Sequence, residues 1–124
     1  MDRETFYDEK QLAIIPMGFC YPGKGKGGDL PPRPECAETW RETLLAQLPN
    51  VALTVVMGRY AIDWHLQPKR GVALTELVRS SQSENVVVLP HPSPRNIRWF
   101  RNNPWLEDEV IPQLRKKVAS LLPN

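Results

Sequence analysis

The sequence lacks any apolar run long enough to cross a membrane. Its longest candidates, residues 12–15 and 51–57, are far shorter than the ~20 residues that span a bilayer. The charged N-terminus, residues 1–4, is followed by no apolar signal core, so nothing indicates secretion. We therefore expect a cytoplasmic protein with no membrane segment.

The chain also has few cysteines and a small net charge. The two cysteines, Cys20 and Cys36, could form one disulfide, but an intracellular compartment would keep both reduced or use them to bind a metal. A net charge of +2 at pH 7 is too small to indicate a nucleic-acid-binding protein from bulk charge. Any such function must be argued from local charge.

The remaining composition is sufficient for one modest hydrophobic core. The chain has 124 residues, of which 41% are hydrophobic, and this predicts a single domain over residues 1–124. The thirteen prolines and seven glycines are clustered, which predicts shaped loops and argues against a collagen-like or disordered chain.

Apolar patterning predicts alternating strands and helices. Short apolar runs at residues 11–17, 51–57 and 86–89 are typical of buried strands. Helical patterns follow them at residues 34–48, with Trp40, Leu44, Leu45 and Leu48 expected to face the core, and at 60–66 and 105–122. The order predicts a three-layer α/β fold, a parallel sheet with helices on both faces.

Two unusual loops follow the first and third predicted strands. They cover residues 18–34, rich in glycine and proline, and residues 90–104. Because ligands of parallel sheets bind at the carboxyl ends of the strands, we expect these loops to meet at one site.

The second loop carries the strongest local signal. Residues 91–101 contain three arginines, one histidine and no acid, and prolines at 90, 92 and 94 stiffen the segment. Arginine suits phosphate groups, and aromatic rings stack on extruded bases. Composition alone favours a simpler alternative, a proline-rich surface loop with a solvated charged face.

The segment His91-Pro92-Ser93-Pro94-Arg95-Asn96 resembles the second signature motif of the uracil-DNA glycosylase superfamily, and especially its single-strand-selective monofunctional branch. It directly follows an apolar strand, as the family's motif does. Residues 51–57, followed by 58–61, also resemble the family's third strand and its turn.

This resemblance implies DNA as the partner and base excision as the reaction. Such enzymes flip a nucleotide into a pocket and break its N-glycosidic bond. By the resemblance, His91 is the catalytic residue, donating a hydrogen bond to the uracil oxygen that becomes negatively charged. Arg95 matches the residue that fills the space left by the flipped base, Ser93 resembles a phosphate contact, and Asn96 and Arg98 are expected to contact DNA.

Cys20 and Cys36 resemble two ligands of the superfamily's iron–sulfur branch, which has the same interval of sixteen residues. A [4Fe–4S] cluster needs four thiolates, and that branch takes the other two from an N-terminal Cys-x-x-Cys that this sequence lacks. The resemblance implies a cluster in a longer form and none in this chain. Two buried reduced cysteines are the alternative.

Two departures from the family pattern are evident. The glycine-rich first motif, which carries the residue that positions the hydrolytic water, is absent, so we expect a fragment lacking about the first two-fifths of the domain. The asparagine that pairs with uracil is replaced within residues 16–19, which leaves Gly18 and Phe19 as the base-pocket candidates. Phe19 could stack on a base or belong to the core.

The leading hypothesis is a DNA-repair glycosylase whose full-length form is active and whose present chain is inactive. The competing hypothesis is a noncatalytic nucleic-acid or nucleotide-binding module with the same fold. An unrelated small-molecule enzyme ranks last, because the neighbouring strands agree with the motif as well. The other histidine, His65, is expected to be a surface or capping residue.

Overall fold

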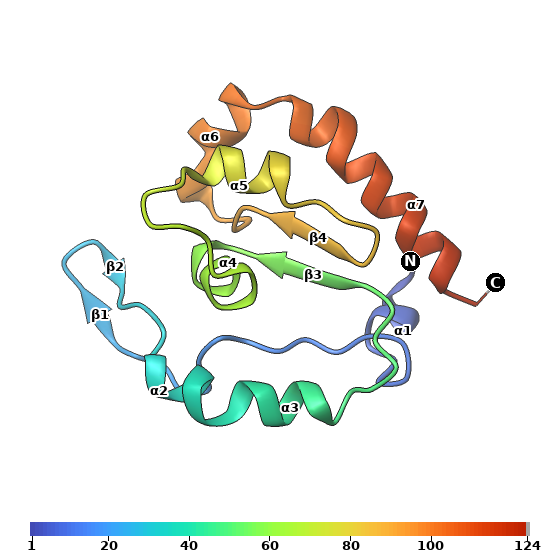
Figure 1. Ribbon diagram of the computed structural model, residues 1–124, viewed down its shortest axis with the longest axis horizontal. Coiled ribbons are helices and arrows are strands. Elements are labelled where there is room, and N and C mark those ends of the chain that lie inside the picture. Colours follow the sequence, from blue (N-terminus) through green and yellow to red (C-terminus); the bar gives the residue numbers. More distant parts are fainter. Residues whose placement is uncertain (124) are drawn as a thin grey trace.

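The protein is built around one pair of parallel strands. In the computed structural model, which describes residues 1–123, β3 (Thr54–Met57) pairs with β4 (Val86–Leu89), with Thr54 opposite Val86 and Met57 opposite Leu89. A small antiparallel hairpin joins β1 (Lys24–Gly25) to β2 (Gly28–Asp29). This α/β arrangement, with a parallel sheet, agrees with the predicted class (Figure 1).

The helices surround the strand pair. In chain order they are α1 (Arg3–Phe6), α2 (Pro34–Cys36), the π-helical η1 (Ala37–Arg41), α3 (Glu42–Ala46), α4 (Arg59–Leu66), α5 (Leu74–Ser80), the 3-10 turn η2 (Pro94–Asn96), α6 (Ile97–Asn102), the π-helical η3 (Leu106–Val110) and α7 (Ile111–Leu121). None of those within residues 1–123 is long and apolar enough to cross a membrane.

The core lies where α4 packs on β3 and α5 packs on β4. Its largest fully buried side chains are Ile62, Leu106, Val56, Val78 and Val88. β-branched valines pack well on a pleated surface, and burying each side chain of this size contributes about 1.5–3 kcal/mol. The core therefore fixes the carboxyl ends of both strands.

The prediction of a first strand at residues 11–17 is wrong. This segment forms no strand, and Ile14 is 68% exposed. No strand within residues 1–123 pairs with it, and Pro16 has no backbone N–H to donate to a ladder. An apolar run forms a strand only where a neighbour satisfies its backbone groups. The observed sheet therefore has two strands instead of the predicted three.

The helix predicted at residues 34–48 is formed as α2, η1 and α3, but the prediction that Trp40 faces the core is wrong. Trp40 is 55% exposed, whereas its neighbour Arg41 is 6% exposed. Ala37 and Arg41 are the buried residues of η1, and they lie on the same helical face as Leu44, Leu45 and Leu48, so Trp40 lies outside that face. Leu44, Leu45 and Leu48 are half-buried.

The predicted loops contain more regular structure than expected. Residues 18–34 include the β1–β2 hairpin, and residues 90–104 include α6. The strand at residues 86–89 and the helix at 60–66 are confirmed as β4 and α4. The last predicted helix is confirmed as η3 and α7.

Candidate functional site

The candidate site lies at the carboxyl ends of β3 and β4, which are side by side. The backbone N–H of Gly58, directly after β3, donates to the carbonyl of Leu89 at 3.0 Å. Pro90 is buried, and the chain then emerges at His91, whose side chain is exposed. His91 is therefore presented two residues beyond a buried strand.

Gly58 lies beside the His91 side chain. Gly58 has φ +84° and ψ 161°, a region that is essentially restricted to glycine. A Cβ built on Gly58 would lie 3.3 Å from the Cβ of His91 and 3.4 Å from its Cδ2. Within residues 1–123, no hydrogen bond engages the His91 ring nitrogens. The imidazole therefore lies beside Gly58 with its ring nitrogens available to a ligand.

The loop after His91 is braced by its own polar groups. The carbonyl of His91 accepts from the backbone N–H of Ser93 at 2.8 Å and from Nδ2 of Asn96 at 2.7 Å. The Ser93 hydroxyl accepts from the backbone N–H of Arg95 at 3.3 Å and so caps η2. Ser93 and Asn96, two predicted DNA contacts, therefore also fix the shape of the loop that carries His91.

Arg95 joins this loop to the glycine-rich hairpin. Its Nη2 donates to the carbonyl of Gly27, and its guanidinium occupies the space beside Gly28 where any Cβ would overlap it. Gly28 has φ +119°, which also favours glycine. As predicted, the loops after residues 18 and 90 meet, on the side of the strand pair toward which β3 and β4 point (Figure 1).

The short helix α6 extends the basic surface. Arg98 and Arg101 are exposed, whereas Trp99 and Phe100 between them are half-buried against the core. Trp99 Nε1 donates to the Thr75 hydroxyl at 3.1 Å, which ties α6 to α5. Within residues 1–123, neither Arg98 nor Arg101 forms an ion pair. Both guanidinium groups are therefore oriented away from the core and toward solvent.

The predicted base-pocket residues lie in the loop that precedes the hairpin. A Cβ on Gly18 would lie 3.1 Å from the Cβ of Pro32, so Gly18 allows the two ends of this loop to approach closely. Phe19 is 45% exposed and lines an open hollow with Trp40 and Leu44. Its ring is accessible and does not belong to the buried core.

The two predicted metal ligands do not form a complete site. Cys20 is exposed and Cys36 is half-buried, and both are free thiols. Across the described residues, no group of three or more histidine, cysteine, aspartate or glutamate side chains could hold a metal ion. Because a [4Fe–4S] cluster needs four thiolates, the ligands present in this chain do not fit one.

One cluster was missed by sequence reasoning, the pair Arg41 and His65. Arg41 Nη1 donates to the carbonyl of Pro16 at 3.2 Å, and Nη2 donates to His65 Nε2 at 2.9 Å. The guanidinium carbon lies 5.2 Å from the centre of the Trp64 ring. Burial lowers the pKa of Arg41, and burial together with the Arg41 charge lowers the pKa of His65.

This cluster is structural in character. His65 accepts from a permanent donor, so it is neutral, and it is half-buried instead of lying at the surface as predicted. Arg41 attaches the extended segment around Pro16 to α4 and η1. A charged residue on an amphipathic helix is normally expected at the surface, so the pattern contained no signal for its burial.

Comparison with known families agrees with this architecture. The family model described as the uracil DNA glycosylase superfamily matches residues 2–115. The match covers the parallel strands, the Gly58 turn and the whole His91–Asn96 loop. The chain therefore belongs to the uracil-DNA glycosylase superfamily.

Proposed function

We propose that the protein acts in DNA base-excision repair, hydrolysing the N-glycosidic bond of uracil or a related damaged base. The observation that carries the proposal is the exposed His91 imidazole, held against Gly58 at the carboxyl ends of two buried strands. An exposed imidazole at the ends of two buried strands suits a ligand that enters from solvent. DNA bases reach such sites by flipping out of the stack.

His91 would act on the leaving group. Cleavage of the N-glycosidic bond leaves positive charge on the sugar and a pair of electrons on the base. A hydrogen bond from His91 to the oxygen that becomes anionic is stronger in the transition state than in the ground state, and so it accelerates the reaction. Water then adds its oxygen to the sugar carbon and gives up a proton, which neutralises the departing base. The products are an abasic site and the free base.

The arginines of the same loop would hold the DNA strand. Arg95, Arg98 and Arg101 are exposed residues of one loop and the helix that follows it, and none forms an ion pair in the described residues. Phosphate contacts of this kind position a nucleic acid without reading its sequence. Arg95, in contact with Gly27, would fill the space that the flipped base leaves.

Two further proposals concern a protein that carries the water-positioning motif in addition to these residues. The motif that positions water is absent from residues 1–124, so we propose that activity requires a form that contains it. Cys20 and Cys36 would supply two of four thiolates for a [4Fe–4S] cluster in such a form, and the fold would have the superfamily's three layers. Iron and sulfide content of that form, with and without Cys20→Ser, tests the cluster.

The activity is tested by measuring release of uracil, hypoxanthine and xanthine from oligonucleotides. A protein carrying residues 1–124 together with the water-positioning motif is expected to release at least one of these bases, and the 124-residue chain none. Release of no base by the longer form would instead support a noncatalytic nucleic-acid-binding module, which the absence of the first motif from this chain favours.

A further inference from the structure

A second basic surface lies along one face of α4, the helix that begins directly after Gly58. Here an open hollow of about 340 Å³ is lined by Arg59, Asp63, Gln67, Pro68, Lys69, Arg70 and Gly71. Three of these side chains are cationic and one is anionic. We refer to this feature as the α4 hollow. No motif in the sequence marks it.

The loop that forms the α4 hollow is fixed by backbone contacts. Gln67 ends α4 with φ 46°, and its N–H donates to the carbonyl of Asp63 at 3.1 Å. The N–H of Val72 donates to the carbonyl of Lys69 at 3.4 Å, across Gly71 with φ +85°. Lys69 and Arg70 therefore project from a turn of defined shape.

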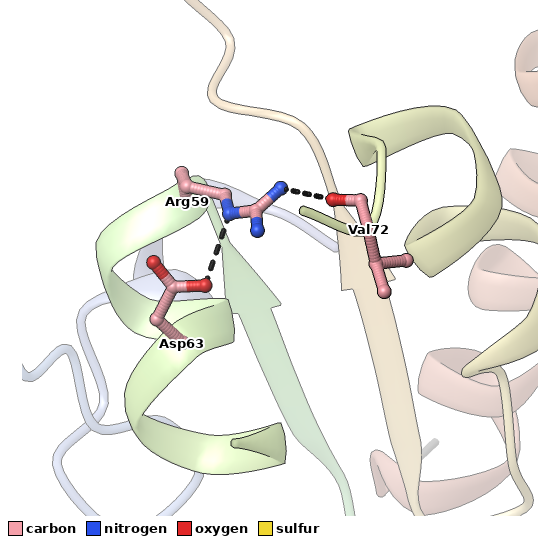
Figure 2. Close-up of polar contacts among 3 residues, drawn as sticks. All are labelled: Arg59, Asp63 and Val72. Atoms are coloured by element: carbon pink, nitrogen blue, oxygen red, sulfur yellow. Dashed lines mark hydrogen bonds and ion pairs between the residues drawn. The ribbon is translucent and has the colours of Figure 1, made fainter. Parts of the chain in front are cut away.

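Arg59 connects this turn to the helix. Its Nε lies 2.9 Å from Oδ1 of Asp63, and its Nη1 donates to the carbonyl of Val72 at 2.8 Å, as Figure 2 shows. The carboxylate of Asp63 is thereby paired with Arg59. Within residues 1–123, Lys69 and Arg70 form no ion pair, and both are exposed. The hollow retains uncompensated positive charge.

The position of the α4 hollow relates it to His91. Arg59 directly follows Gly58, the residue that contacts His91. The segment between α4 and α5 lies on the side of the strand pair toward which β3 and β4 point, as do the β1–β2 hairpin and the loop after β4 (Figure 1). The α4 hollow therefore begins one residue after Gly58, and its loop lies on the same side of the strand pair as the loop that carries His91.

We propose that the α4 hollow binds a phosphodiester of the DNA strand that flanks the nucleotide presented to His91, through Lys69 and Arg70. This inference rests on the proposed function. Arg59 holds the turn, Lys69 and Arg70 supply the charge, and the open shape of the hollow suits a phosphate, which stays partly hydrated when bound. The contact depends on the backbone and not on base identity.

The test compares oligonucleotide binding by the 124-residue chain and two double variants. Lys69→Ala with Arg70→Ala removes two charges from the hollow. Arg115→Ala with Lys116→Ala removes two exposed charges from α7 and serves as the matched control. The first is expected to weaken single-strand binding about tenfold, and the salt slope should fall by about 0.7 for each phosphate that the variant no longer neutralises. The control should leave the slope unchanged.

A scan of single methylphosphonate linkages then locates the phosphate that binds. Neutralising one linkage beside the target should weaken binding by the wild-type chain and have no further effect on the Lys69 and Arg70 variant. Equal losses of affinity in both, or equal slopes for the hollow and control variants, would overturn the proposed site. Protection of the hollow by uridine monophosphate without any methylphosphonate effect would also overturn it.

The outcomes separate this proposal from the proposed function. Weaker DNA binding by the Arg95→Ala, Arg98→Ala variant, with unchanged binding by the Lys69 and Arg70 variant, would overturn only the phosphate site at the α4 hollow. If the wild-type chain binds no oligonucleotide, uracil-containing or otherwise, both the DNA function and the hollow are overturned.

Discussion

Gly58 lies beside His91, whose Cβ is 3.3 Å from the position that a Cβ on Gly58 would take. Gly58→Ala should therefore displace the imidazole as well as strain the backbone, since φ is +84°. We expect a loss of about 1–3 kcal/mol in the free energy of unfolding, measured by urea denaturation.

Gly71→Ala provides the control for this variant. Gly71 has φ +85°, but nothing lies within 4 Å of the position that a Cβ would take there. Gly71→Ala should lose stability without altering the His91 ring signals in NMR spectra, whereas Gly58→Ala should shift them. Unchanged His91 signals in Gly58→Ala would contradict the contact.

A second prediction concerns Arg95 and the hairpin. Because the Arg95 guanidinium occupies the space beside Gly28, Gly28→Ala should expel it and weaken DNA binding as Arg95→Ala does. The two substitutions should be non-additive in a double-mutant cycle. Gly27→Ala, where the added methyl meets open space, should have little effect. Strict additivity of Gly28→Ala and Arg95→Ala would exclude the coupling.

The pH dependence of stability should report on His65. Burial and the Arg41 charge lower its pKa below the ordinary 6.5, so the unfolded chain binds the proton more readily than the folded one. Stability is then complete above pH 6.5 and is lost as pH falls from there toward the folded pKa. His65→Gln should flatten this part of the profile in thermal unfolding. A profile identical to wild type would show that another group is responsible.

The basic loop should dominate DNA binding. Replacing Arg95, Arg98 and Arg101 by alanine removes three exposed charges from one surface. Affinity for single-stranded or mismatched DNA should fall, and the plot of log affinity against log salt should become flatter. Arg115→Ala with Lys116→Ala, on α7, should leave that slope unchanged. Salt-dependent binding that persists unaltered in the triple variant would remove this loop from the interface.

Much of the fold follows from local patterns. The valine-rich run at β4 is bounded by polar residues and Pro90, and α4 and α7 have helical spacing of apolar residues. The helix α5 also carries a usable signal, because Leu74, Leu77 and Val78 recur at helical spacing within a polar stretch.

Other features depend on contacts that local patterns do not contain. Residues 11–17 have the composition of a strand, but pairing requires a neighbour that the described chain does not supply. Trp40 is exposed because the inward face runs through its neighbour Arg41, whose partners, the carbonyl of Pro16 and His65, lie far away in the sequence. The motif singled out His91 as a candidate, whereas the contacts of Arg95 with Gly27 and of Arg41 with Pro16 join segments far apart in the sequence.

The most direct test of the central claim is single-turnover release of uracil from an oligonucleotide, measured in a protein that carries residues 1–124 together with the water-positioning motif. His91→Ala should lower the rate by ~10²–10³, the usual effect of removing one transition-state donor, while DNA affinity changes much less. Equal rates for the wild type and His91→Ala would show that His91 has no catalytic role and would contradict the account.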